Sequence, residues 1–144
     1  MASTNLGTAV AWLAGLETGL GNLSPFMTAV ARHVTDVSKQ SFANQASPGG
    51  LGWKRLADAT VADRAAQGYG PTPILVRTGN LRDSIRYAVD LVGSSASVGS
   101  DLVYAGVHQF GNRYKPKVPA RPFLGVPSSS ESFIWKSLEK HLSL

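Results

Sequence analysis

Apolar residues recur at helical spacing in the first third of the chain. Residues 5–20 carry a rough apolar stripe that is weakened by three glycines. Residues 24–43 carry a clearer stripe, with Ser24 placed to cap a helix and Pro25 in its favoured first turn. The apolar positions of this second stripe are Phe26, Val30, Val34 and Val37. The pattern predicts two helices, the second ending before the helix-breaking sequence Ser47–Gly50.

The middle of the chain combines loops with short helical patterns. Residues 51–67 predict a loop anchored by Trp53, followed by a short helix rich in alanine and charge. The glycines and prolines of residues 68–73 predict a flexible loop. Asn80 is placed to cap a single helical turn, with Asp83 positioned to complete a capping box. We therefore expect two short helices on either side of this loop.

The hydrophobic period then changes from helical to alternating, which is typical of a half-buried strand. The alternating apolar positions are Ile85, Tyr87, Val89 and Leu91. Gly93 and Ser94 fit a two-residue type II′ turn, which needs glycine first. Such a turn returns the chain along residues 95–99 and places Val98 opposite Val89. The pattern predicts an antiparallel hairpin.

Two further helices are expected near the C-terminus. Residues 101–110 carry Val103, Val107 and Phe110 at helical spacing. Ser128–Glu131 has the sequence of a capping box. The apolar residues that follow it at helical spacing are Ile134, Leu138 and Leu142.

These elements together predict an α+β fold, with helices packed on a small antiparallel β-sheet. At 144 residues and without internal repeats, the chain corresponds to one domain, residues 1–144. Residues 1–45 form its N-terminal helices, residues 46–127 an α+β core with loops, and residues 128–144 a C-terminal helix.

Composition excludes several classes of function. Without cysteine, the chain has no disulfide framework, thiolate nucleophile or cysteine-ligated metal site. The N-terminal apolar segment has no positive charge before it and is too short to span a bilayer, so we expect a soluble protein without its own export signal. The net charge of +5 favours polyanionic partners. Most basic residues are scattered, and those that approach a cluster are Arg113, Lys115, Lys117 and Arg121.

The run Tyr104–Gly125 contains the most chemically distinctive residues. His108 is a candidate general base, with Ser84, Ser100 or Asp101 as partners, but no serine lies in a nucleophile motif. The chain also lacks metal-ligand spacing and a phosphate-binding glycine loop. We expect no catalytic residue, cofactor or metal, and a small hydrolase built around His108 is the least favoured hypothesis.

Three prolines stiffen the segment that follows His108, because each fixes its own backbone and restricts the residue before it. They are Pro116, Pro119 and Pro122. A stiff segment that carries Phe123 and Leu124 has already lost part of the entropy that binding costs, which suits docking onto a neighbour or a sheet edge.

Several segments, in this order and spacing, resemble the phage virion morphogenesis family, which includes tail completion proteins of Mu-like and P2-like tailed phages. The segments are PGGLGWKRL (48–56), Thr60, PILVRTGNLRDSI (73–85), YAGVHQFG (104–111) and PARPFLG (119–125). The resemblance extends from Phe42 to Leu138, about two thirds of the chain. Gly49 departs from the acidic residue that the family usually has there, which affects only a loop.

The resemblance implies a structural virion protein without catalytic activity. Such proteins are small α+β subunits that form rings, usually of six copies, at the head–tail junction or tail end. They complete the tail and allow head–tail joining after assembly in the host cytoplasm. The implied neighbours are head-connector proteins and tail-tube or terminator proteins, with no membrane contact.

A closed ring needs two different complementary patches on each subunit. We expect the helix at 24–43 and the C-terminal helix to supply one patch. We expect the loop at 68–73 and the loop stiffened by the three prolines to supply the other. The candidate interface residues are Trp53, Leu81, Tyr104, His108, Gln109, Phe110, Arg121, Phe123 and Leu124. The alternative function is DNA binding without sequence specificity, in which Arg113, Lys115 and Lys117 contact phosphates.

Overall fold

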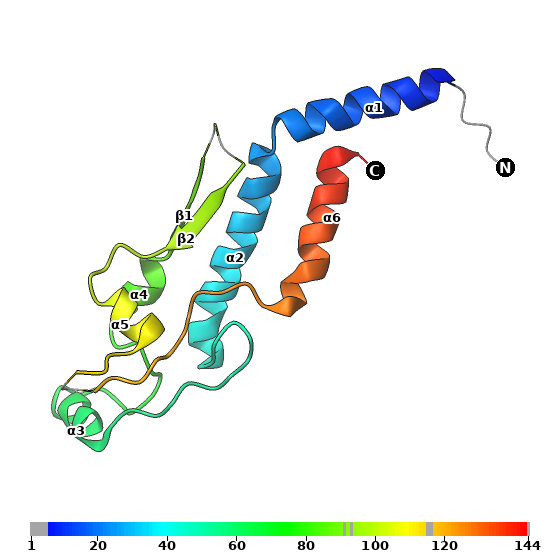
Figure 1. Cartoon of the computed structure of the whole chain (residues 1–144). Helices are drawn as coiled ribbons and strands as arrows, with labels where there is room; N and C mark the ends of the chain where they lie inside the picture. Colours follow the sequence, from blue (N-terminus) through cyan, green and yellow to red (C-terminus); the bar gives the residue numbers. More distant parts are fainter. Residues whose placement is uncertain (1–5, 91, 93, 115–116, 144) are drawn as a thin grey trace.

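The long helix α2 (Ser24–Asn44) is the centre of the fold. The computed structural model describes residues 6–90, 92, 94–114 and 117–143. In it, α2 lies between a β-hairpin and the C-terminal helix α6 (Glu131–Leu142), and both pack directly on it (Figure 1). Helices packed on a small antiparallel sheet make an α+β fold, which confirms the predicted class.

The remaining helices are distributed toward the two ends of α2. The N-terminal helix α1 (Leu6–Gly21) contacts α6 and then runs away from the rest of the chain (Figure 1). Toward the opposite end of α2 lie α3 (Asp58–Ala66), α4 (Asn80–Asp83) and α5 (Ala105–Phe110) (Figure 1). A 3-10 turn, η1 (Ser128–Ser130), leads into α6. Every predicted helix is present, although α5 begins four residues later than expected.

The hairpin pairs β1 (Arg86–Val89) with β2 (Ala96–Gly99) in antiparallel register. Tyr87 lies opposite Val98, and Val89 lies opposite Ala96, so the predicted pairing of Val98 with Val89 is wrong by two residues. The shift preserves the buried face, because side chains alternate with a period of two. The Asp90 N–H donates to the Ser95 carbonyl at 3.0 Å, so the connection is longer than a two-residue turn. Leu91 and Gly93, which the prediction also used, lie outside the described residues.

The core lies between α2, the hairpin and the loops that connect the short helices. Phe42 is at its centre, because its ring packs edge-on against Trp53 at 5.4 Å and obliquely against Phe123 at 5.5 Å between centroids. The buried apolar residues of the cluster are Phe42, Trp53, Ile74, Leu81, Ile85, Ala105 and Phe123. Residues far apart in sequence therefore form one core.

The three predicted helix caps are wrong. Ser24 is the first residue of α2 and follows the cap position, although Pro25 does occupy the first turn. Asn80 likewise lies inside α4, and the Asp83 carboxylate pairs with Arg82 at 2.7 Å instead of completing a capping box. The predicted capping box of α6 begins at Ser128, but Ser128 lies in the 3-10 turn η1. Ser130 occupies the cap position of α6, and its side chain makes no capping hydrogen bond because its hydroxyl is hydrogen-bonded to His33 Nε2 of α2 at 2.8 Å.

Candidate subunit interfaces

The segment around Arg121 is fastened to the loop that contains Trp53. The Arg121 guanidinium donates from Nε to the Lys54 carbonyl at 2.7 Å and from Nη2 to the Arg55 carbonyl at 2.9 Å. Its backbone N–H donates to the His108 carbonyl at 2.7 Å. Arg121 therefore ties the 119–125 segment to two separate parts of the chain.

Gln109 and Trp53 hold the same segment from either side. The Gln109 Oε1 accepts hydrogen bonds from the backbone N–H groups of Phe123 and Leu124, both at 3.0 Å, and its Nε2 donates to the Leu124 carbonyl at 3.1 Å. The Trp53 indole N–H donates to the Pro122 carbonyl at 2.8 Å. The Gln109 amide, next to His108 in the chain, thus satisfies three backbone groups of this segment.

The nine candidate interface residues divide by burial. Trp53, Leu81, Arg121 and Phe123 are buried within their own chain. His108, Gln109 and Leu124 are half-buried, whereas Tyr104 and Phe110 are exposed. The buried four stabilise the fold of the single chain, and their contact with a neighbouring subunit stays a prediction. Tyr104 and Phe110 are free to meet a neighbour.

The apolar face predicted for residues 101–110 points outward. Val103, Val107 and Phe110 are all exposed, and Ala105 is the residue of α5 that enters the core. The helical spacing correctly predicted a helix here but indicated the wrong face for burial. The buried residue is Ala105, whose small side chain packs against the core cluster. The exposed residues therefore form an apolar surface with Tyr104.

His108 is half-buried and neutral in character. Burial, followed by the charge of Arg121, lowers the pKa of its imidazole below the ordinary value of 6.5. Its Nδ1 is buried without a hydrogen-bond partner among the described residues. Ser84 does not serve as its partner, because its hydroxyl bonds the Ser100 hydroxyl and the Leu81 carbonyl, both at 2.7 Å.

The lowered pKa of His108 predicts that acid destabilises the fold. The unfolded chain binds a proton at this imidazole more readily, so the stability that the neutral form contributes is lost as the pH falls through 6.5. We expect the free energy of unfolding, measured by urea titration at pH 7.5 and 5.5, to fall less in a His108→Gln variant than in the original chain. Every other titratable group is common to both proteins, so its contribution cancels in this comparison. An equal loss in both would contradict the assignment to His108.

The basic cluster around residue 117 is smaller than the sequence suggested. Arg113, Tyr114 and Lys117 are exposed, whereas Arg121 is turned inward. Lys115 lies outside the described residues. Arg121 is therefore not available for phosphate contact, and the surface charge at this loop is correspondingly reduced.

The part of the chain that the structure describes has neither a metal-binding cluster nor a membrane-spanning helix. Within residues 6–90, 92, 94–114 and 117–143, no three His, Asp or Glu side chains gather in a way that would hold a metal ion. Across the same part of the chain, no helix combines the length and apolar character needed to cross a membrane.

Helix α1 exposes a large apolar surface, where the sequence predicted a rough apolar stripe without indicating its exposure. Val10, Trp12, Leu13 and Leu20 are each more than half exposed. The helix has one charged residue, Glu17, among its sixteen. That near-absence of charge was the available signal, since a helix that is apolar on all sides is normally buried.

The end of α1 is fixed against the end of α6. The Gly19 carbonyl is hydrogen-bonded to His141 Nε2 at 2.9 Å. A β-carbon at Gly19 would come within 2.9 Å of Leu142 Cδ2, so the two helix ends pack closely at this glycine, and a larger residue would make the Leu142 side chain shift. The exposed apolar residues of α1 therefore extend from an anchored base.

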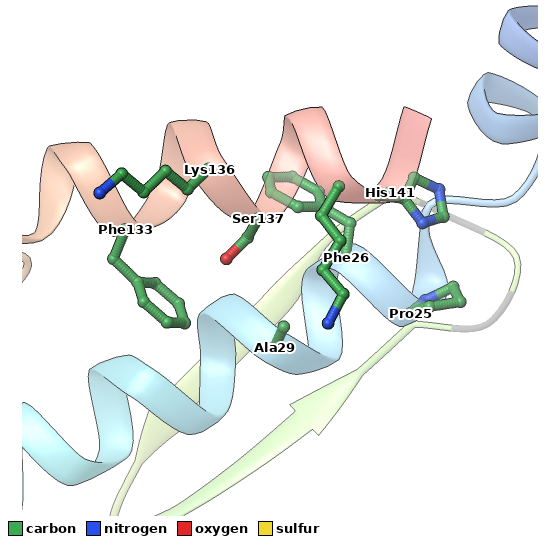
Figure 2. Close-up of a pocket in the computed structure, with 8 residues that line it drawn as sticks. Pro25, Phe26, Ala29, Phe133, Lys136, Ser137 and His141 are labelled. Atoms are coloured by element: carbon green, nitrogen blue, oxygen red, sulfur yellow. The ribbon is translucent and has the colours of Figure 1, made fainter. Parts of the chain in front are cut away.

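A mostly apolar groove lies between α2 and α6, next to this base. It has a volume of about 570 Å³, and side chains from both helices line it (Figure 2). The lining residues are Pro25, Phe26, Ala29, Phe133, Lys136, Ser137, Lys140 and His141. The two lysines are exposed, so the groove combines an apolar floor with positive charge on α6.

Exposed apolar surface of the kind that α1 and α5 carry marks sites where a protein associates with another protein. The chain belongs to the phage virion morphogenesis family, which it matches over residues 5–143. The match includes the N-terminal residues that the sequence motifs left unassigned.

Two relatives are phage or prophage proteins. The chain is 35% identical over 112 residues to "Putative capsid assembly protein G" of Escherichia phage Mu, covering 74% of this chain and 70% of that protein. It is 31% identical over 125 residues to "Mu-like prophage FluMu G protein 2" of Haemophilus influenzae, covering 84% of this chain and 79% of that protein. No solved structure matches the chain.

Proposed function

We propose that this protein is a structural subunit of a tailed phage particle, that it forms a ring at the head–tail junction, and that it completes the tail for head–tail joining. Membership of the virion morphogenesis family supports the general role. The ring, six copies in number, contacts head-connector proteins on one side and tail-tube or terminator proteins on the other.

The observation that carries the proposal is the exposed apolar surface of α1. Burying one large apolar side chain contributes about 1.5–3 kcal/mol, so four such residues left in water favour association strongly. Because α1 is anchored only at its end, the rest of the helix is available to a neighbouring subunit.

The α2–α6 groove is the surface that best complements α1. It is apolar, and it lies on the same subunit as α1 but on different residues, as a head-to-tail ring interface requires. Lys136 and Lys140 at the groove also complement Glu17, the one acidic residue of α1. In the proposed ring, α1 of each subunit occupies the groove of the next.

The test is to place charge on α1 and measure assembly. A Trp12→Glu, Leu13→Glu double variant should weaken self-association by about 100-fold or more, because two buried apolar contacts are lost. Light scattering after size-exclusion chromatography should show a ring for the original chain and a monomer for the variant. Circular dichroism should be unchanged, since both side chains are exposed in the single chain.

Leu51→Glu is the matched control, because Leu51 is an exposed leucine in a loop away from α1. It should assemble normally. An original chain that stays monomeric at high concentration, or a double variant that assembles as well as the control, would overturn the proposal.

The alternative function, DNA binding without sequence specificity, has less support. It relies on exposed cations near residue 117, and the inward position of Arg121 removes one of the four that approach a cluster in the sequence. Few phosphate contacts give weak binding, because each contact contributes to the electrostatic attraction, and the dependence of that binding on salt is shallow.

A further inference from the structure

A second cavity of about 570 Å³ lies at the other end of the molecule from the α2–α6 groove, beside α3. Residues of α3, α4, α5 and the 117–121 segment line it. Four cationic residues contribute to its wall: Arg64, Arg77, Lys117 and Arg121. This cavity shares no lining residue with the α1 interface proposed above.

Two of these cations are buried arginines. Arg64 is 6% exposed and Arg121 is 4% exposed. Arg64 donates from Nε to the Gly70 carbonyl at 2.8 Å and from Nη2 to the Pro73 carbonyl at 3.2 Å, much as Arg121 bonds its own two carbonyls. Carbonyl groups satisfy hydrogen bonds, but they carry no net negative charge. Among the residues that the structure describes, neither arginine forms an ion pair.

The single acidic residue in the wall does not neutralise them. The Asp63 carboxylate accepts a hydrogen bond from the Gln67 side chain at 2.9 Å and forms no ion pair with either buried arginine. The other two cations lie at the surface, where Arg77 stacks over the Tyr69 ring at 5.6 Å and Lys117 is exposed. Buried charges in proteins are normally paired with an opposite charge, whereas these two buried arginines are not paired within the described part of the chain. The cavity therefore offers uncompensated positive charge to an anion.

His108 adds an unused polar group to the same wall. Its Nδ1 is buried and has no hydrogen-bond partner among the described residues. A neutral imidazole can donate from one ring nitrogen, and the protonated form donates from both. His108 therefore leaves a polar atom beside the cavity that no described residue satisfies.

We propose that this cavity binds a carboxylate of an acidic segment from a neighbouring protein of the particle. The proposal rests on the assembly function above. A slender acidic peptide fits better than DNA, because two of the four cations are buried where a duplex backbone does not reach. A different protein fits better than a second copy, because the ring proposed above joins copies through α1 and the α2–α6 groove and does not use the residues of this cavity.

The test measures binding of an acetylated, amidated hexaglutamate peptide, with hexaglutamine as the neutral probe. NMR should show shifts of the Nε–H signals of Arg64 and Arg121 on adding hexaglutamate, and none on adding hexaglutamine. These two arginines are observed and not replaced, because their removal would break the loops that they hold.

Rim variants then locate the binding site without disturbing the interior. An Arg77→Gln, Lys117→Gln variant should weaken hexaglutamate binding by about tenfold or more, since it removes the two exposed cations beside the cavity. An Arg32→Gln, Arg86→Gln variant loses the same net charge at exposed positions outside the cavity and should bind nearly as well as the original chain. Equal weakening in both variants, or unchanged arginine signals at saturating peptide, would overturn the proposal.

Two further binding measurements distinguish the possible sources of the anion. Inorganic phosphate that binds as tightly as hexaglutamate would overturn the preference for a carboxylate. Binding that occurs in the monomeric α1 variant but is lost in the assembled ring would show that a second copy already fills the cavity, which overturns the choice of partner. The assembly test measures oligomeric state with variants of α1, which leave the cavity unchanged. A failure of the ring proposal can therefore be distinguished from a failure of the peptide to bind.

Discussion

Replacing Phe123 with alanine should lower the free energy of unfolding by about 3–5 kcal/mol, the usual cost of removing a fully buried phenylalanine. Phe123 is 0% exposed, and its ring packs against Phe42 at the centre of the core. The backbone around it is also held by Gln109, so the surrounding structure has little freedom to close the cavity. Urea titration followed by circular dichroism measures the loss.

Phe110→Ala is the matched control for this experiment. Phe110 comes from the same sequence region but is 82% exposed. The substitution should change stability by no more than about 0.5 kcal/mol, as expected for a surface position. If both variants lose the same stability, Phe123 does not have the central position described here.

Replacing Gly111 with alanine should cost about 3 kcal/mol or more, from backbone strain and steric overlap together. Gly111 has φ +78° and ψ 176°, a conformation essentially restricted to glycine. A β-carbon there would come within 2.9 Å of the Ala120 nitrogen and the Val118 carbonyl oxygen. Both are backbone atoms, so they cannot move aside as a flexible side chain would.

The substitution Gly106→Ala, in the helix that Gly111 follows, should have the opposite effect on stability. Gly106 lies inside α5, and a β-carbon there meets nothing within 4 Å. The change should raise stability by about 0.5–1 kcal/mol, because alanine is the better helix former. Thermal unfolding of the two variants side by side decides the matter, and a Gly111→Ala protein as stable as Gly106→Ala would refute the backbone argument.

The sequence predicted the elements of this fold better than their ends. Helix α2 and the hairpin followed from periodicity, because burying one face imposes a repeat that survives in any context. The prediction of the helix caps was wrong, because serine and asparagine side chains can bond several partners, and some of these are distant in the sequence. Ser130 bonds His33, which is 97 residues away, and no local motif contains that information.

The candidate site was predicted in part, for a similar reason. The motif residues Trp53, Gln109 and Arg121 stood out in the sequence, but the patterns did not say whether they meet a neighbour or their own chain. Arg121 bonds carbonyls 66 and 67 residues away, which only the folded structure reveals. The cationic cavity was missed because Arg64 and Arg121 belong to separate segments that folding brings together.

The hydrogen bond from Trp53 to Pro122 spans 69 residues, so we expect it to form late in folding. Closing so long a loop costs entropy before any contact is gained. During synthesis α1 and α2 emerge first, and Phe42 lacks its ring contact with Phe123 until that residue has left the ribosome. We therefore expect the core to be complete only when more than four fifths of the chain has been made.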